Sequence, residues 1–174
     1  MKHFLVVVDM QTDFIDGALG TPEAVAIQPA VLQKIHSFRG EIFATLDTHG
    51  ENYLRTAEGR HLPVTHCVKG TPGWALASEI AAALQERAAV LVEKPTFGSL
   101  VLPQLIEDAA GGEDFDVTVI GLCTDICVVS NALLLKGRFH EKEVYVDAAC
   151  CAGVSPEKHE AALEVMRSCQ INIL

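Results

Sequence analysis

Two cysteines stand four positions apart in the segment "GLCTDICVV" (121–129), where an apolar run gives way to a helical pattern. A thiolate in the first turn of a helix is stabilised by backbone N–H groups, which can also receive an oxyanion. Cys127 is therefore a candidate nucleophile. A small buried hydrophobic residue is the commoner role for such a cysteine. A disulfide partner and a metal ligand are further alternatives, although no second cysteine pair has suitable metal-site spacing.

Two charged residues follow apolar runs elsewhere in the chain. Asp9 comes after residues 3–8, and Lys94 comes after residues 88–93. A strand-end turn residue and a solvated lysine are the simpler interpretations, but a carboxylate after a wholly apolar run is costly unless it is paired or functional. Together with Cys127, they have the chemistry of a nucleophile, a base and an orienting group. Asp9 could accept the thiol proton, and Lys94 could keep Asp9 ionised.

A second group of residues could bind a metal ion. Asp47 and His49 form the motif "DTH", and on an extended segment two such side chains lie on the same side. His66 would complete a three-ligand site with open positions, with Glu58 as a candidate fourth ligand and His61 as an outside candidate. Two histidines and an acid across a loop are a weak signal alone. Three other histidines are interpreted as surface residues: His36, His140 and His159.

Apolar, β-branched runs alternate with helical patterns along the chain. Strands are expected at 3–8, 41–46, 88–93, 115–120, 142–147 and 171–174. Helices are expected at 24–39, 77–87, 99–108, 125–137 and 155–169, the last with Ser155 as N-cap and Pro156 at its first position. This alternation predicts an α/β fold with a mostly parallel sheet, whose ligands collect at the carboxyl ends of the strands. The long segment 47–73 lacks periodicity, which favours a functional loop.

Length and composition predict a single domain over residues 1–174, because 49% of the residues are apolar and no break in composition occurs. The net charge of −10 and the lack of a Lys/Arg cluster argue against nucleic acid or anionic membrane as partners, so a small molecule is expected. The first residues form too short an apolar run for a signal peptide or membrane span. A cytoplasmic protein with free thiols is expected.

Six fragments follow one another over nearly the whole chain: "VVVDMQTDF", "DTH", "HCVKGTPGW", "EKPTFGS", "GLCTDICV" and "VYVDAACCAG". In this order and at these separations they resemble the isochorismatase-like cysteine hydrolases, and within them the nicotinamidases. The resemblance implies a three-layer α/β/α fold with a six-stranded, mostly parallel sheet. It implies a catalytic triad of Asp9, Lys94 and Cys127, and homo-oligomers.

The resemblance also assigns the surroundings of the triad. It implies a cis peptide bond between Leu122 and Cys123, so that the backbone N–H groups of Cys123 and Cys127 form an oxyanion hole. Asp47, His49 and His66 correspond to ligands of a divalent metal, for which zinc is expected and iron and manganese are alternatives. In nicotinamidases this metal accepts the pyridine nitrogen of the substrate. Phe14 matches an aromatic residue of the ring pocket, and Trp74 is a further candidate for it.

These observations predict a metal-dependent cysteine amidohydrolase that converts nicotinamide to nicotinate and ammonia. Isochorismatases themselves lack the nucleophilic cysteine, so Cys127 favours the amidase branch. The segment "HLPVTHC" departs from the nicotinamidase pattern, which often has an aromatic residue shortly before the third ligand. One alternative is an amidase or a carbamoyl or ureido hydrolase that acts on another small amide. Another is a binding or scaffolding protein without catalytic activity.

Overall fold

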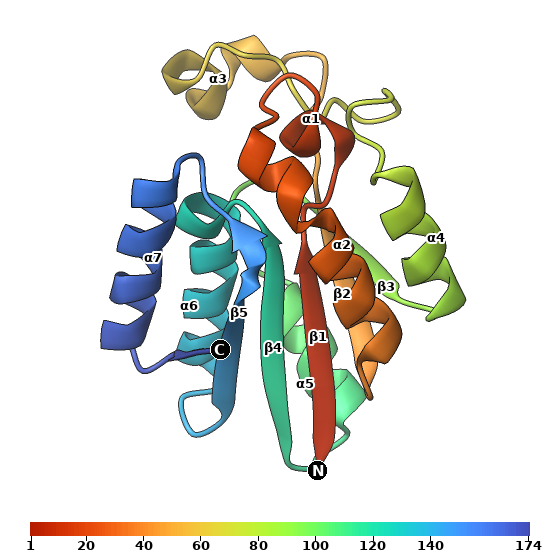
Figure 1. Ribbon diagram of the computed structural model, residues 1–174, viewed down its shortest axis with the longest axis vertical. Helices are drawn as coiled ribbons and strands as arrows, with labels where there is room; N and C mark the ends of the chain where they lie inside the picture. The colour runs from red at the N-terminus through yellow and green to blue at the C-terminus, as the bar shows by residue number, and fades with distance from the viewer.

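The computed structural model describes residues 1–174 and contains one six-stranded sheet between two layers of helices (Figure 1). The sheet order is β3-β2-β1-β4-β5-β6, and every neighbouring pair is parallel. Its strands are β1 (Lys2–Val8), β2 (Glu41–Asp47), β3 (Val90–Lys94), β4 (Phe115–Leu122), β5 (Glu143–Ala152) and β6 (Asn172–Ile173). The predicted three-layer fold is therefore confirmed, with a sheet that is parallel throughout.

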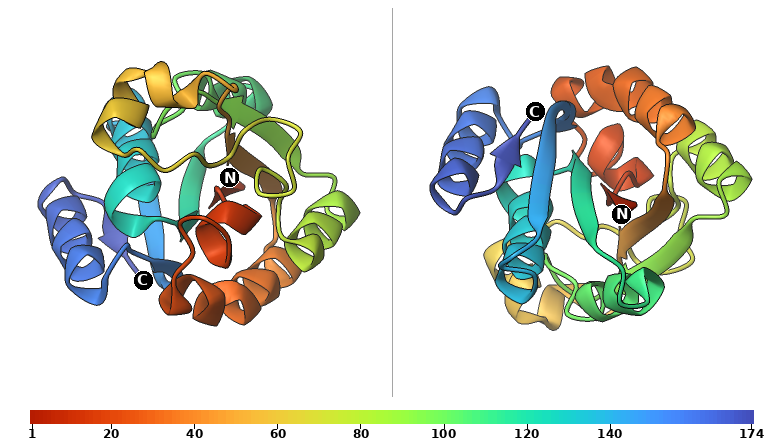
Figure 2. Two further views of the ribbon diagram at one scale, coloured as in Figure 1. Left: turned by 90° about the horizontal axis from the view of Figure 1, so that it is seen from above. Right: turned by 90° about the horizontal axis from the view of Figure 1, so that it is seen from below.

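Helices cover both faces of the sheet, as the two end-on views of Figure 2 show. One face packs against α5, α6 and α7, and the other packs against α1, α2 and α4. The α-helices are α1 (Thr12–Ile15), α2 (Pro22–Ser37), α3 (Ala57–His61), α4 (Ser78–Glu86), α5 (Leu102–Ala110), α6 (Val129–Arg138) and α7 (Pro156–Ser168). None of them combines the length and apolar character that a membrane crossing requires.

The position of β1 between two layers of helices explains why its sequence is apolar without interruption. Phe4, Val6 and Val8 belong to the core on the α5–α7 side of the sheet. Leu5 and Val7 belong to the core on the opposite side. Since successive side chains of a strand point to opposite faces, a strand covered on both faces must be apolar at every position. The apolar run was therefore a reliable sign of a central strand.

Several element boundaries differ from the predicted ones. Strand β3 begins at Val90, two residues later than predicted, and ends at Lys94; Ala88, before the strand, has a positive φ of 50°. Strand β5 continues to Ala152, five residues beyond its predicted end, after an irregularity in its register with β4. Helix α5 begins at Leu102, three residues late. Helix α7 begins as predicted, since the Ser155 hydroxyl accepts a hydrogen bond from the backbone N–H of Lys158 at 3.3 Å.

The segment 47–73 contains two short helices that were not predicted. A 3-10 helix, η1, spans Tyr53–Arg55, and α3 follows it with Thr56 as N-cap. The Thr56 hydroxyl accepts a hydrogen bond from the backbone N–H of Gly59 at 3.0 Å. Helices of three and five residues are too short to show periodicity in a sequence. Helix α3 lies at the end of the molecule toward which the strands β1 and β4 point (Figure 1).

Gly121 is required where β4 passes β1. Its φ is 115°, and a Cβ atom there would lie 2.2 Å from the carbonyl oxygen of Val8. We therefore predict that Gly121→Ala lowers the free energy of unfolding in urea by at least ~2 kcal/mol, from backbone strain and displacement of β1. Gly137→Ala is the control, because nothing lies within 4 Å of a Cβ at this helical glycine. It should leave stability unchanged or raise it by up to ~1 kcal/mol. Equal stability of the two variants would contradict the prediction.

Candidate active site

Three chemically active side chains meet at the carboxyl end of the sheet. Asp9 follows β1, Lys94 ends β3, and Cys127 lies in a π-helical turn, η2 (Thr124–Val128), which follows β4. Strands β1 and β4 are neighbours in the middle of the sheet. The chain continues from β1 to β2 toward one edge of the sheet, and from β4 to β5 toward the other edge. The carboxyl ends of such a strand pair form the crevice in which α/β proteins bind ligands. The structure therefore brings together the three residues that the sequence singled out.

Asp9 and Lys94 form a completely buried ion pair. The Nζ atom of Lys94 lies 2.6 Å from Oδ2 of Asp9, and both side chains have no solvent exposure. The Thr45 hydroxyl donates a 2.6 Å hydrogen bond to Oδ1 of Asp9. Burial raises the pKa of Asp9, while Lys94 and Thr45 lower it in part. Burial alone would lower the pKa of Lys94, but Asp9, Cys127 and Asp47 outweigh burial and raise this pKa, so Lys94 stays charged.

Cys127 lies beside this ion pair. Its Sγ atom is 3.6 Å from Nζ of Lys94, and the residue is buried. Burial and the charge of Asp9 raise the pKa of Cys127 well above its ordinary value, while Lys94 lowers it in part. The site thus holds a protonated thiol next to a carboxylate whose own pKa is raised. This combination is suited to a thiol that becomes nucleophilic when a neighbouring base takes its proton.

The turn that carries Cys127 has an unusual backbone. The peptide bond between Leu122 and Cys123 is cis, as the family resemblance implies. The helical segment after it opens as a π-helical turn, not as the ordinary first turn of a helix that was expected. Asn131 stabilises this turn, because its Nδ2 donates a 2.8 Å hydrogen bond to the carbonyl of Cys127. Its Oδ1 accepts a hydrogen bond from the N–H of Ser99 at 3.0 Å.

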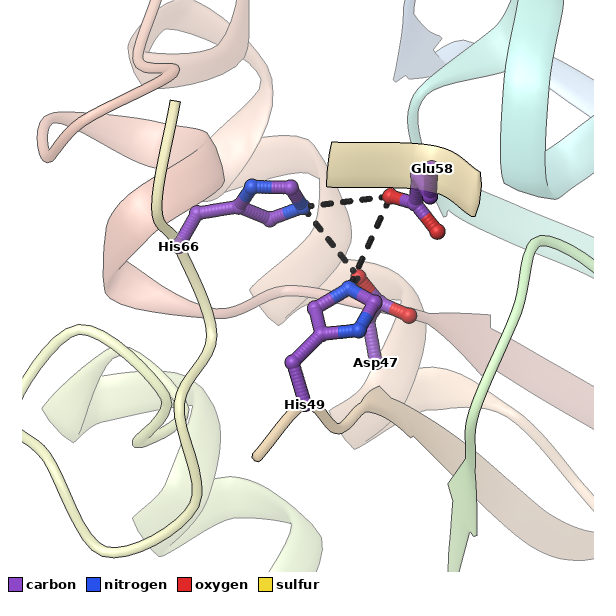
Figure 3. Close-up of side chains that lie close together, drawn as sticks. All are labelled: Asp47, His49, Glu58 and His66. Carbon is purple, nitrogen blue, oxygen red and sulfur yellow. Dashed lines mark hydrogen bonds and ion pairs between the residues drawn. The ribbon is translucent and has the colours of Figure 1, made fainter. Parts of the chain in front are cut away.

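A second cluster joins the two carboxylates and two histidines that the sequence proposed as metal ligands (Figure 3). Nε2 of His49 lies 2.9 Å from Oδ2 of Asp47, and Nε2 of His66 lies 3.5 Å from the same oxygen. Oε1 of Glu58 is 3.6 Å from both of these nitrogens. All four ligand atoms lie within 4.8 Å of one another. Glu58 comes from α3, so the unpredicted helix supplies one member of the cluster.

The donor atoms fit a divalent ion. Ligands bound at about 2.0–2.2 Å lie roughly 3–3.5 Å apart around a first-row metal, close to the separations seen here. Imidazole and carboxylate ligands suit zinc, iron or manganese. Nδ1 of His66 lies 2.7 Å from the carbonyl oxygen of Val64, a contact that directs Nε2 toward the cluster. Oδ1 of Asp47 is buried and accepts no hydrogen bond, although Lys94 lies 3.5 Å away.

Two supporting residues were not predicted from the sequence. The Gln11 side chain donates 2.8 Å hydrogen bonds to the carbonyls of Asp47 and Trp74, and accepts one from the N–H of Asp47 at 2.8 Å. Tyr53 is buried, and its ring centroid lies 4.8 Å from the rings of both His49 and His66. Gln11 is a polar residue soon after a strand end, which was a usable signal. Tyr53 had no such sequence signal, because nothing in its segment marks it as buried.

A small cavity of about 40 Å³ joins the two groups. It is lined by Phe14, Leu19, Asp47, Glu58, Leu62, His66, Phe97, Cys123, Ile126 and Cys127. The Phe14 ring borders this cavity and lies 5.5 Å from the ring of His66. Trp74 does not line the cavity. Its indole N–H instead donates a 2.9 Å hydrogen bond to the Thr48 hydroxyl.

A larger cavity of about 670 Å³ lies outside the first one. The two share Glu58, Leu62, Phe97 and Ile126, which form the wall between them. His61 lines this outer cavity and does not belong to the four-residue cluster, so the structure gives no support to its candidacy as a metal ligand. The apolar wall residues were not predicted as pocket residues, because a single apolar side chain in a loop carries no sequence signal of what it faces.

Comparison with known proteins identifies the family. Residues 3–174 match the family model described as the isochorismatase domain, and the chain belongs to the isochorismatase family. No curated protein sequence shows significant similarity to the chain.

Solved structures extend this comparison. A pyrazinamidase of Pyrococcus horikoshii, in complex with zinc, is 32% identical over 100% of this chain and 99% of its own, with a TM-score of 0.79. A pyrazinamidase/nicotinamidase from Streptococcus mutans is 26% identical over 99% of this chain and 100% of its own, with a TM-score of 0.84. A protein from L. infantum, in complex with nicotinate, shares the fold at 22% identity, over 99% of this chain and 92% of its own, with a TM-score of 0.83. The family match and the first two of these neighbours support a hydrolase that acts on amides.

The four-residue cluster predicts one divalent ion per chain. Protein dialysed against zinc and then against buffer should retain about one equivalent by elemental analysis, and His49→Ala should lose most of it because a close ligand is removed. His61→Ala is the matched control, since His61 lies outside the cluster, and it should bind like the native chain. Equal metal content in the native chain and His49→Ala would show that the cluster is not the site.

Proposed function

We propose that the protein is a metal-dependent cysteine amidohydrolase that converts nicotinamide to nicotinate and ammonia. The observation that carries this proposal is the contact of Lys94 with both Asp9 and Cys127, at the edge of a cavity that Asp47, Glu58 and His66 also line. A nucleophile, a base and a ring-binding group are thereby available to one small substrate. We also propose that residues 1–174 form a single domain.

The reaction begins with transfer of a proton. Asp9 accepts the proton of Cys127, and the thiolate attacks the amide carbonyl carbon. The C–N bond then breaks, and Asp9 returns the proton to the departing ammonia. The acyl group remains on Cys127 as a thioester. A water molecule gives a proton to Asp9 and attacks the thioester carbon, the C–S bond breaks, and the carboxylic acid is released. Asp9 then returns the proton to the sulfur of Cys127, which restores the thiol.

Lys94 and the backbone stabilise the charges that develop. Lys94 holds Asp9 in place and keeps it ionised before the proton transfer, because the ammonium group lies 2.6 Å from the carboxylate. The tetrahedral intermediate carries a negative oxygen, for which we propose the N–H groups of Cys123 and Cys127 as donors. Each such donor is typically worth about 10²–10³-fold in rate. The position of both cysteines at the cavity agrees with this role.

Substrate orientation is assigned to the cluster of Asp47, His49, Glu58 and His66. A divalent ion bound there would act as a Lewis acid toward the pyridine nitrogen. The Phe14 ring borders the same cavity and offers an apolar face to the substrate ring. The zinc in the Pyrococcus horikoshii pyrazinamidase and the nicotinate in the L. infantum protein support this assignment. We propose zinc as the ion, with iron and manganese as alternatives.

A second candidate function keeps the chemistry and changes the substrate. The outer cavity adjoins the inner one through Leu62, Phe97 and Ile126, so an amide with a group larger than a pyridine ring could extend into it. A panel of primary amides, carbamoyl and ureido compounds discriminates the two functions. A binding protein without activity is the weaker interpretation, because it would gain nothing from burying Asp9 and Lys94 beside a thiol.

Ammonia release tests the proposal directly. Zinc-loaded protein should release ammonia from nicotinamide and from pyrazinamide, and Cys127→Ala should reduce the rate to background because no acyl acceptor remains. Cys123→Ala is the matched control, since only the backbone of Cys123 is used, and it should keep most of the activity. An active Cys127→Ala variant would falsify the mechanism. Metal-loaded protein that releases no ammonia from either compound would remove the substrate assignment.

Lys94 provides a separate test of the ion pair. Lys94→Met keeps the apolar stem and removes the charge, so the pKa of Asp9 rises further and its carboxyl group keeps a proton. We expect the turnover of nicotinamide to fall by ~10²–10⁴-fold, the usual range for loss of a general base. Lys69→Met is the control, because Lys69 forms an exposed pair with Glu93 near the end of β3. Similar turnover in both variants would contradict the role of Lys94, and urea unfolding shows whether each variant remains folded.

A further inference from the structure

The turn that carries Cys127 is hydrogen-bonded to a segment that lies far from it in the chain, residues 154–159. The Thr124 hydroxyl lies 2.7 Å from Nδ1 of His159, a residue in the first turn of α7. Thr124 is completely buried and His159 is partly buried, although the sequence indicated a surface histidine. Neither residue lines the inner or the outer cavity.

A second contact joins the same two segments. Oδ1 of Asp125 accepts a 2.9 Å hydrogen bond from the N–H of Val154, in the connection between β5 and α7. This connection approaches so closely that it requires glycine at position 153. A Cβ atom on Gly153 would lie 2.8 Å from the backbone nitrogen of His159 and 3.0 Å from Oδ1 of Asp125. Two consecutive residues of the turn are thus bound by one short segment.

These contacts hold the backbone segment from Cys123 to Cys127, which carries the proposed nucleophile and the proposed oxyanion donors. Thr124 directly follows Cys123, and Cys127 lies three residues farther on in the same turn. A hydroxyl that is completely buried depends on its one side-chain partner, since water does not replace a lost hydrogen bond there. A shift of the turn would move the Sγ atom of Cys127 relative to Asp9, together with the two proposed oxyanion donors. Displacements of about 1 Å at a reacting group cost ~10²-fold in rate.

We propose that His159 is a positioning residue, which holds the turn between Cys123 and Cys127 in its reactive geometry through its hydrogen bond with Thr124. It touches neither the substrate cavity nor the metal cluster. His159 therefore affects the rate of the chemical step and has little effect on substrate affinity. This inference rests on the proposed function for its kinetic measurement, but its thiol measurement is independent of any substrate.

The kinetic experiment compares four test variants and one control variant with the zinc-loaded native protein, using the amide that the native protein hydrolyses. His159→Ala and Thr124→Val should each lower kcat by ~10–100-fold, with KM changed less than ~3-fold. His159→Asn and Thr124→Ser should recover most of this loss, because an amide nitrogen or oxygen can occupy the Nδ1 position and serine keeps the hydroxyl. His140→Ala is the matched control, since His140 is an exposed histidine outside both cavities, and it should behave like the native protein.

The double variant with His159→Ala and Thr124→Val separates a specific bond from general damage. If the two residues act through one hydrogen bond, the double variant should be no slower than the worse single variant. Multiplication of the two losses would overturn the inference. Unchanged kcat in His159→Ala, or equal loss in His159→Asn and His159→Ala, would also overturn it. Urea unfolding of each variant shows that kcat is compared between folded proteins.

Alkylation of Cys127 by iodoacetamide gives a measurement that no substrate assignment affects. Mass spectrometry of the labelled peptides follows Cys127, with the exposed Cys169 as the internal reference for reagent reactivity. His159→Ala should slow the labelling of Cys127 relative to Cys169 by at least ~5-fold, because the thiol moves away from its base, and His159→Asn should restore it. An unchanged ratio in His159→Ala would overturn the inference. Failure of the native protein to hydrolyse any amide would remove the proposed function and leave this measurement as the test.

Discussion

The ion pair between Asp9 and Lys94 is the interaction on which the site depends. Two charges removed from water are stable only when close contact and further polar groups compensate for the lost hydration. Here Thr45 donates to Asp9, while Lys94 donates to the carbonyl of Thr96 at 3.0 Å and lies beside Cys127. The pair also connects β1 with β3 across β2. The strand order of the sheet is therefore a condition for the chemistry of the thiol.

Asp47 links this ion pair to the metal cluster. One of its oxygens faces the two histidines, and the other lies 3.5 Å from Nζ of Lys94. Gln11 binds both the N–H and the carbonyl of Asp47, and so fixes the residue that belongs to both groups. A change in the charge or position of either group would consequently affect the other group. The proposed nucleophile, its base and the proposed ring-binding ion thus form one electrostatic unit.

Local sequence patterns predicted most of the fold because central strands and amphipathic helices leave a periodic or continuous apolar signal. The strand ends then indicated which polar residues would meet, and the structure brings Asp9, Lys94 and Cys127 into contact. Short helices leave no such signal, which explains why α3 was missed. The direction of Trp74 was not predictable, because an aromatic residue in a loop can pack in several ways, and here its indole N–H donates a hydrogen bond to Thr48.

The sequence by itself determined the parallel α/β architecture and the residue types at the carboxyl ends of its strands, because burial on two faces and reactive side chains are properties of single segments. Only the tertiary structure decided the distances: the approach of α3 that adds Glu58, the wall between the two cavities, and the bond between Thr124 and His159. These features join segments far apart in the chain. They depend on the packing of three-dimensional surfaces, which no local pattern encodes.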